Sequence, residues 1–234
     1  MIERFEWRGT LPESGQARLV NAYGDLRVRP GQRDEVYVLA NIQHHREDAR
    51  LVDIHVGSEA GALEVEVVYP DSAVGREHPA EWNRRRVDLT VLLPASTRVE
   101  GTTVAGLAEF RGLSGEVSAV SETGEIRWRG SGALVARTQH GAVLAQFRRG
   151  IWKGRAVVET STGAIRAELP RDADVTATAQ TRGEISTDYS MRIEFLSEEL
   201  KRGVVGEAGE AVLVLKSYSG TVKLLRSRVA ADQG

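Results

Sequence analysis

Glutamates near recurring glycines are the side chains best suited to acid–base chemistry in this sequence. Two carboxylates that face each other across a groove can cleave a glycosidic bond. Polysaccharide-cleaving solenoids cluster aspartates for this purpose, but no aspartate here recurs at a fixed offset from those glycines. Solvated strand faces therefore explain the acids better than catalysis does. The glutamates concerned are Glu122, Glu125, Glu159, Glu168 and Glu184.

Histidines are the next candidates, as metal ligands. The neighbours His44 and His45 would point to opposite faces of a strand, so they are poorly placed to share one ion. The chain has no cysteine, which excludes thiolate sites and disulfides. We therefore predict no metal, no cofactor, no catalytic residue and no enzyme activity. The other histidines are His55, His78 and His140.

Basic residues recur at the third position after a glycine. A column of them would offer a basic face to an anionic polymer. Glu109, Leu144 and Ser186 interrupt the column, and charges on exposed strands also prevent edge aggregation. Both interpretations stay open. The basic residues are Arg27, Arg127, Arg166 and Lys223, with Arg129, Arg137 and Arg155 nearby.

Composition narrows the possible partners. Lys plus Arg is 31 and Asp plus Glu is 33 among 234 residues, which gives a net charge of −2. No basic excess points to nucleic acid. The longest apolar runs, such as Val36–Ala40, are far shorter than the roughly 18 residues of a membrane helix. The start resembles no signal peptide, so we expect a cytoplasmic protein if Met1 is the native start; otherwise the compartment is unknown.

A short repeat carries most of the structural information. Each unit has a small polar residue, then a glycine three positions later, then alternating apolar residues. From Gly106 to Gly183 the glycines follow at intervals of about 20 residues, and Gly220 comes after a longer gap that holds an insertion or a degraded repeat. The polar residue and glycine of each unit are Asn21 and Gly24, Thr103 and Gly106, Ser121 and Gly124, Thr138 and Gly141, Thr160 and Gly163, Gln180 and Gly183, and Ser217 and Gly220.

Period-two alternation on both sides of each glycine predicts a strand, a corner and a second strand. We expect glycine to supply a positive φ at the corner and the small polar residue to bond backbone groups freed there. Units of this length stack as the coils of an all-β, single-stranded β-solenoid. A β-sandwich or barrel remains the alternative. The apolar ladder should contain Ile126, Val143, Ile165, Ile185 and Val222.

The flanking regions are less regular. We predict one β domain over 1–234, with an irregular cap and first coils over about 1–100, repeat coils over about 101–225 and a tail over 226–234. Ser190–Gly203 is interpreted as holding one helical turn, and Gly203–Gly209 lacks the lysine of a phosphate loop. Further predicted elements are a hairpin or first coil at Ala17–Val28, strands at Val36–Ile42, Leu51–Val56, Leu63–Tyr69 and Val87–Leu93, and a mixed-charge loop at Pro70–Arg86 that includes Arg84-Arg85-Arg86.

The strand Val87–Pro94, the following Ala95–Val99 and the repeated Thr-x-x-Gly-x-Ile units resemble the bacterial "putative adhesin" family of β-strand-repeat domains. The resemblance covers about 17–225. It implies a right-handed β-solenoid, often exported or membrane-tethered, without established catalytic residues. No leader or membrane segment is recognised in this sequence, so we expect the chain to depart from the family in this respect.

Together these features favour a non-catalytic structural or binding module. It would present a repetitive β face to an unknown protein, to a polysaccharide of the cell envelope or to a second copy of itself. Two alternatives stay open: a carbohydrate-active enzyme on the same architecture, and a cytosolic regulatory or sensory partner of a membrane-anchored protein.

Overall fold

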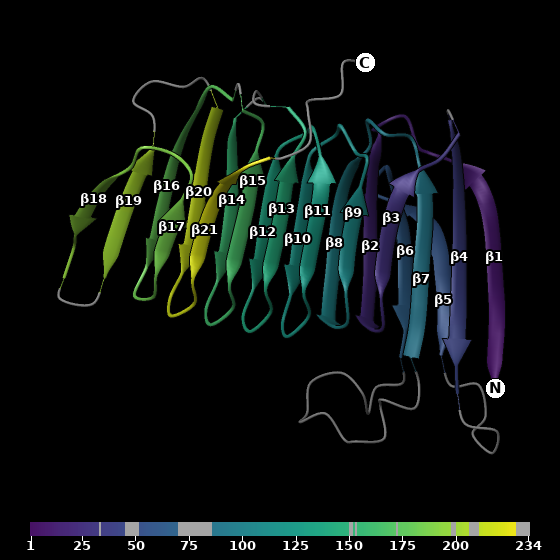
Figure 1. Cartoon of the computed structure of the whole chain (residues 1–234). Helices are drawn as coiled ribbons and strands as arrows, with labels where there is room; N and C mark the ends of the chain where they lie inside the picture. The colour runs from purple at the N-terminus through teal and green to yellow at the C-terminus, as the bar shows by residue number, and fades with distance from the viewer. Residues whose placement is uncertain are drawn as a thin grey trace.

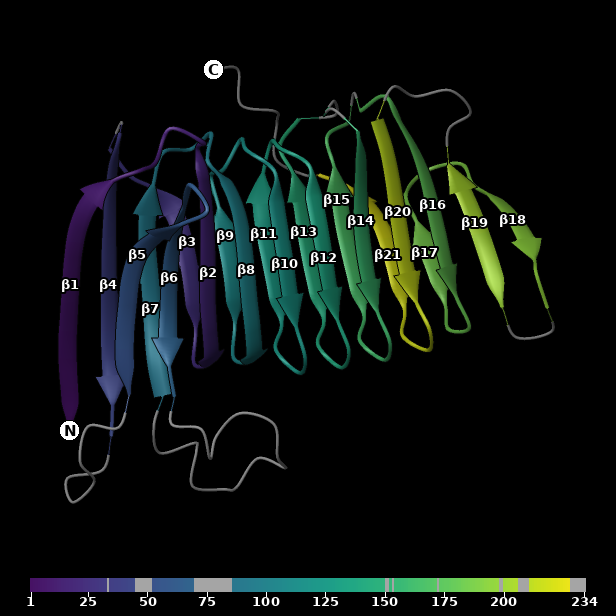
Figure 2. The same cartoon turned by 180° about the vertical axis from the view of Figure 1, so that it is seen from behind.

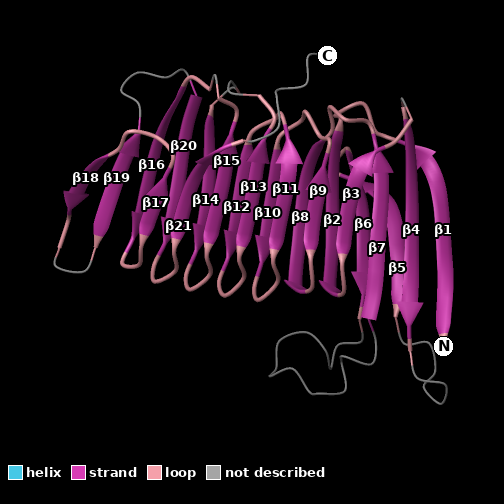
Figure 3. Ribbon diagram, in the orientation of Figure 1, coloured by secondary structure: helices cyan, strands magenta, loops and turns pink. Residues whose placement is uncertain are grey.

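The computed structural model describes residues 1–32, 34–44, 52–69, 86–149, 152, 154–171, 173–197, 200–205 and 211–227. All regular structure in these residues is β, arranged as a ten-stranded and an eleven-stranded sheet (Figures 1 and 3). The predicted all-β class is confirmed. Both sheets are open, because each has an edge strand at either end.

The ten-stranded sheet is called sheet A and the other sheet B. Across sheet A the strands run β1 (Ile2–Thr10), β4 (Glu35–Gln43), β7 (Arg86–Leu93), β3 (Leu26–Pro30), β9 (Ala108–Arg111), β11 (Ile126–Gly130), β13 (Val143–Phe147), β15 (Ile165–Leu169), β21 (Val222–Arg226) and β17 (Ile185–Thr187). Across sheet B they run β18 (Arg192–Phe195), β19 (Lys201–Val205), β16 (Val175–Thr181), β20 (Ala211–Ser217), β14 (Arg155–Thr160), β12 (Leu134–Thr138), β10 (Val117–Ser121), β8 (Arg98–Ala105), β2 (Gln16–Tyr23), β6 (Ala62–Val68) and β5 (Asp53–Glu59). Figure 2 shows the same stack from behind.

Each repeat contributes one strand to each sheet and pairs in parallel with the equivalent strands of its neighbours. Ile126 pairs with Val143, Val143 with Ile165, and Ile165 with Val222. Their side chains point between the sheets and are buried. These four members of the predicted apolar ladder are therefore confirmed, and they belong to a hydrophobic core that runs from Ala17 to Leu224. The fifth, Ile185, pairs with Val222 at the end of the row and is only partly buried.

The order of the last coils in space differs from their order in the sequence. Strand β20 lies between β14 and β16, and β21 lies between β15 and β17. Figure 1 shows these two yellow strands set among green ones. The long gap before Gly220 is thus an insertion: the chain leaves the stack after β17, forms β18 and β19, and returns one layer earlier.

The helical turn predicted within Ser190–Gly203 is wrong for the described residues. Strands β18 and β19 occupy this segment and extend sheet B in an antiparallel direction from β16. A strand that pairs with the edge of β16 forms a row of backbone hydrogen bonds. A single isolated helical turn would leave most of its backbone N–H and C=O groups without such bonds. Glu198 and Glu199 lie outside the described residues.

Near the N-terminus, the predicted strands correspond to β4, β5, β6 and β7, and Ala17–Val28 forms the first coil as β2 and β3. Leu51 and residues 70–85 of the predicted loop, with Arg84 and Arg85, lie outside the described residues. Arg86 is described, and it forms ion pairs with Asp25 and Asp88, each at 2.7 Å.

The corner glycines stack in one column, but the reason differs from the one predicted. Only Gly24 and Gly106 in this column have a positive φ, of 119°. At Gly163 the constraint is space, because a Cβ there would lie 1.8 Å from the carbonyl oxygen of Gly141. The same close approach recurs along the column. In order, the column contains Gly24, Gly106, Gly124, Gly141, Gly163, Gly220 and Gly183.

The small polar residue bonds the corner backbone in most repeats, as predicted. Thr103 differs, because its hydroxyl donates to the hydroxyl of Ser121 at 3.0 Å. The Thr160 hydroxyl accepts a hydrogen bond from the N–H of Gly163 at 3.0 Å and donates one to the carbonyl of Gly141 at 3.1 Å. One assignment was wrong. Thr181, and not Gln180, accepts from the N–H of Gly183, because that corner is one residue shorter. Gln180 consequently faces outward.

Replacing Gly163 with alanine should lower the free energy of unfolding by at least about 2 kcal/mol, because the added Cβ overlaps a backbone carbonyl that cannot rotate away. Gly15→Ala is the control: Gly15 has a φ of 66° but open space around it, so the cost should be about 1 kcal/mol. Denaturant unfolding measures both. A larger loss at Gly15 than at Gly163 would contradict the importance of close approach.

Thr160→Val should cost about 1–3 kcal/mol, since it removes a hydroxyl that satisfies one buried donor and one buried acceptor. Thr102→Val changes an exposed threonine of β8 in the same sheet and should stay within about 0.5 kcal/mol. Thermal and denaturant unfolding of the two variants give the comparison. Equal stability of both variants would remove the proposed role of the corner hydroxyl.

Candidate functional site

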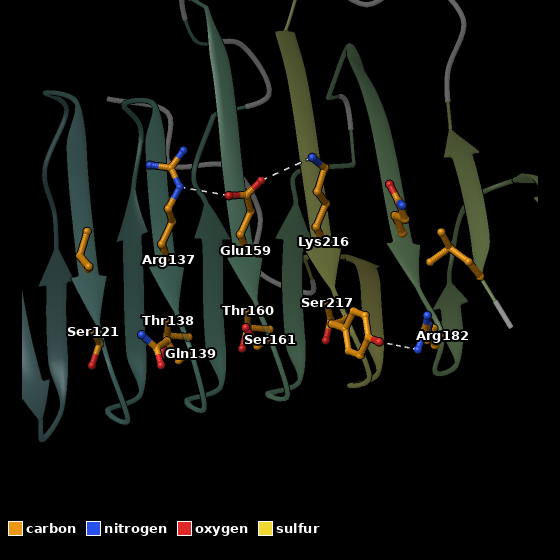
Figure 4. Close-up of a pocket in the computed structure, with 14 residues that line it drawn as sticks. Ser121, Arg137, Thr138, Gln139, Glu159, Thr160, Ser161, Arg182, Lys216 and Ser217 are labelled. Carbon is orange, nitrogen blue, oxygen red and sulfur yellow. Dashed lines mark hydrogen bonds and ion pairs between the residues drawn. The ribbon is translucent and has the colours of Figure 1, made fainter. Parts of the chain in front are cut away.

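An open groove of about 560 Å³ lies on the outer face of sheet B (Figure 4). Its size falls within the range of small-ligand sites. It crosses β10, β12, β14, β20 and β16 near the glycine corners and reaches the start of β19. The lining residues are Val120, Ser121, Arg137, Thr138, Gln139, Glu159, Thr160, Ser161, Gln180, Arg182, Leu200, Lys216, Ser217 and Tyr218.

Strand alternation and register place the central side chains of the groove in one row. In β12, Leu134 and Ala136 point into the core, so Arg137 points out. Arg137 pairs with Glu159, Glu159 with Lys216, and Lys216 with Gln180. Neighbouring members of this row are about 4.8 Å apart at the backbone.

Charges alternate along the row and are mutually satisfied. Glu159 accepts a hydrogen bond from Nε of Arg137 at 3.0 Å and lies 3.5 Å from Nζ of Lys216. Figure 4 shows both contacts as dashed lines. Such partly exposed pairs add little to stability. Their effect here is to hold three long side chains in a fixed order across the groove.

Tyr218 forms one end of the groove. Its side chain is exposed, although large apolar side chains usually lose most of their exposure in a fold. The guanidinium of Arg182 lies 4.3 Å from the ring centroid and donates a 2.5 Å hydrogen bond to the hydroxyl. This contact covers part of the ring and fixes its orientation. An oriented, exposed aromatic ring is a surface on which a ligand can stack.

The polar groups near the corners divide into two sets. The hydroxyls of Thr138, Thr160 and Ser217 bond the corner backbone. The side-chain amides of Gln139 and Gln180 have no hydrogen bond to other described residues, and both line the groove. These amides can donate to and accept from a ligand.

The predicted acids do not converge. Among the described residues that line the groove, Glu159 is the only carboxylate. Glu168 lies on the outer face of sheet A, where it pairs with Arg166 at 2.7 Å, and Glu125 pairs with Arg127 at 2.8 Å. Glu122 and Glu184 lie at glycine corners. The sequence analysis weighed these five residues as one possible catalytic set and preferred solvated strand faces; Glu159 lies in sheet B, and Glu168 lies in sheet A.

The histidines lie apart from the groove. Nε2 of His44 is 3.0 Å from a carboxylate oxygen of Glu3, and Nδ1 of His140 is 3.2 Å from the hydroxyl of Thr162. His55 lies in β5, while His45 and His78 fall outside the described residues. Within the described ranges, no three His, Asp or Glu side chains are grouped to hold a metal ion.

The four predicted basic residues that follow a glycine lie in one row on the outer face of sheet A. Arg129 lies in the same sheet, but Arg137 and Arg155, which were expected nearby, lie in β12 and β14 of sheet B. Arg27, Glu109, Arg127, Leu144, Arg166, Lys223 and Ser186 follow one another across the strands. Acidic neighbours pair with several of its cations, including Arg27, which contacts Asp25. Burial alone would raise the pKa of Glu109, but hydrogen bonds and charges from Arg29 and Arg111 outweigh it and lower the pKa below its ordinary value.

Several residues of the groove were missed from the sequence, among them Gln139, Arg182, Lys216 and Tyr218. Tyr218 follows the polar residue of the last repeat, but its exposure depends on β20 lying between β14 and β16. Leu200 was assigned to a helical turn. Gly203 lies in β19, whereas Gly206 and Gly209 of the glycine-rich segment are outside the described residues.

Comparison with family models and with curated protein sequences finds no match. Two crystal structures are similar. One is a putative cell adhesion protein from Clostridium sporogenes, 12% identical, with a TM-score of 0.49 over 96% of this chain and 100% of that one. The other is a putative adhesin from Bacteroides fragilis, 8% identical, with a TM-score of 0.37 over 96% of this chain and 97% of that one. In the described part of the chain, no helix is long and apolar enough to cross a membrane.

Proposed function

We propose that the chain is a non-catalytic binding module that holds a polysaccharide of the cell envelope in the groove of sheet B. The observation that carries the proposal is the open groove across five strands, with an oriented tyrosine at one end and amides and charged groups along it. A long, open groove suits a chain-like ligand better than a compact one.

The chemistry of the groove favours binding without reaction. Glycoside hydrolysis by two carboxylates requires a pair separated by about 5–9.5 Å. Glu159 has no carboxylate partner among the lining residues, and Arg137 and Lys216 both contact it. The carboxylate oxygens of Glu159 already face both cations, an arrangement that suits a hydrogen-bond acceptor.

The lining also favours a sugar over an extended peptide. A peptide that binds by strand addition needs the free edge of a sheet, but the groove lies across the face of paired strands. A sugar ring offers an apolar face that can stack on Tyr218 and hydroxyls that can bond Gln139, Gln180 and Glu159. The order of these side chains along the row would then select the ligand.

Tyr218→Ala should weaken binding of a matching oligosaccharide about tenfold or more, as expected when an exposed aromatic anchor is truncated. The matched control is Tyr37→Ala, since Tyr37 also lies under a guanidinium, that of Arg8, but on the outer face of sheet A. A glycan array with wild-type protein selects the probe, and titration calorimetry measures all three proteins. No binding to any glycan, or equal losses in the two variants, would contradict the proposal.

We also propose that the chain associates with a second copy through β18, the edge strand of sheet B. Its outer ladder groups have no partner strand in the described sheet, and a free edge pairs readily with another strand. Phe195, which is 71% exposed, and its neighbours Ile193 and Leu196 give this edge an apolar surface. Paired edges would bury that surface.

Light scattering over a range of concentrations tests this association. The apparent mass of the wild-type protein should rise with concentration, and Phe195→Lys should keep it at the mass of one chain, because a charge would be placed in the interface. Ile2→Lys, at the opposite end of the stack on β1, is the control and should behave like the wild type. A single-chain mass at all concentrations would overturn the proposal.

A further inference from the structure

A second pocket lies on the other side of the molecule, where strands of sheet A run into the turns between coils. It has a volume of about 400 Å³. Of the eight described residues that line it, four are arginines and none is acidic. The lining residues are Arg111, Gly112, Leu113, Arg129, Gly130, Ser131, Arg148 and Arg149.

The parallel register brings these arginines together. Arg111 ends β9 and pairs directly with Arg129 of β11. Arg148 and Arg149 follow the end of β13, the next strand across the sheet. Backbones of neighbouring strands are about 4.8 Å apart, so the side chains of Arg111 and Arg129 start from adjacent positions of the sheet. One anion in the pocket can therefore contact both.

Arg111 and Arg129 differ in their ion pairs with carboxylates. Arg111 forms an ion pair with Glu109, which also contacts Arg29. Glu109 lies beside the pocket and does not line it. Arg129 is half-buried, and its guanidinium has no ion pair with a carboxylate among the described residues. A bound anion would therefore form its strongest new ion pair with Arg129.

Backbone groups contribute little to recognition here. The N–H of Gly112 donates to Arg129, that of Ser131 to Leu113, and that of Arg148 to Gly130, each to a carbonyl oxygen. Two side-chain donors of the lining, the Arg129 guanidinium and the Ser131 hydroxyl, have no hydrogen bond to another described residue. The planar fork of a guanidinium matches two oxygens of a phosphate or sulfate group.

We propose that this pocket binds a tetrahedral oxyanion, a phosphate or sulfate group, with Arg129 and Arg111 as its principal ligands. The site is separate from the groove of sheet B. The pocket has room for more than one such group, so the oxyanion would be carried on a larger body such as a sugar. An anionic envelope glycan and a free sugar phosphate share this chemistry.

Titration with inorganic sulfate and phosphate, followed by ¹H–¹⁵N NMR at constant ionic strength, tests the proposal. The Nε–H signal of Arg129, assigned by its loss in Arg129→Gln, should shift and saturate. In that variant the affinity, read from the Ser131 amide, should fall about tenfold. Arg127→Gln removes the same charge from the same strand outside the pocket, and its affinity should stay within about twofold of wild type.

Three outcomes would overturn the proposal: no saturation with either anion, the same shifts with chloride, or an equal loss of affinity in both variants. Titrations with glucose 1-phosphate and with a sulfated polysaccharide separate the two sources. Tighter binding of the sugar phosphate than of free phosphate identifies a small ligand, and tighter binding of the polymer identifies a glycan. Because Tyr218→Ala leaves this pocket intact, failure here and failure of the groove proposal are distinguishable.

Discussion

The approach of one coil to the next at the glycine corners sets the geometry of the whole stack. At Gly163 there is no room for a side chain, because the carbonyl of Gly141 occupies the place of a Cβ. The Thr160 hydroxyl fixes the same corner by bonding both glycines. Once the corners are stacked in this way, the register of both sheets is fixed. The apolar ladders inside and the charged rows outside then follow from strand alternation.

The sequence was informative where the structure is periodic. Alternation and the fixed offset of glycine placed Ile126, Val143 and Ile165 in one ladder, because those signals depend only on neighbouring residues and on identical units stacking. The basic row on sheet A was located for the same reason. Its ion pairs, such as Arg27 with Asp25, depend on side-chain positions that spacing does not determine.

Prediction from the sequence failed where a strand could pair with any of several others. Any coil edge could have accepted β20, and nothing local marks the layer between β14 and β16. The short corner at Thr181 changed the phase by one residue, which moved Gln180 to the outer face and into the groove. The candidate groove was therefore not visible in the sequence, since its row joins strands that are distant along the chain.

The return of the chain into its own stack has a consequence for how the protein is made. Residues 211–227 supply the layer between β14–β15 and β16–β17, but a ribosome synthesises them after both neighbours. If coils were added strictly in the order of synthesis, β16 would pair with β14. In the final structure β20 lies between them, so the edge of β14 must either remain unpaired until β20 is made or exchange β16 for β20. This layer can therefore be completed only after residues 211–227 have been synthesised. Assembly is governed by contacts of long sequence separation, which slow the folding of β proteins.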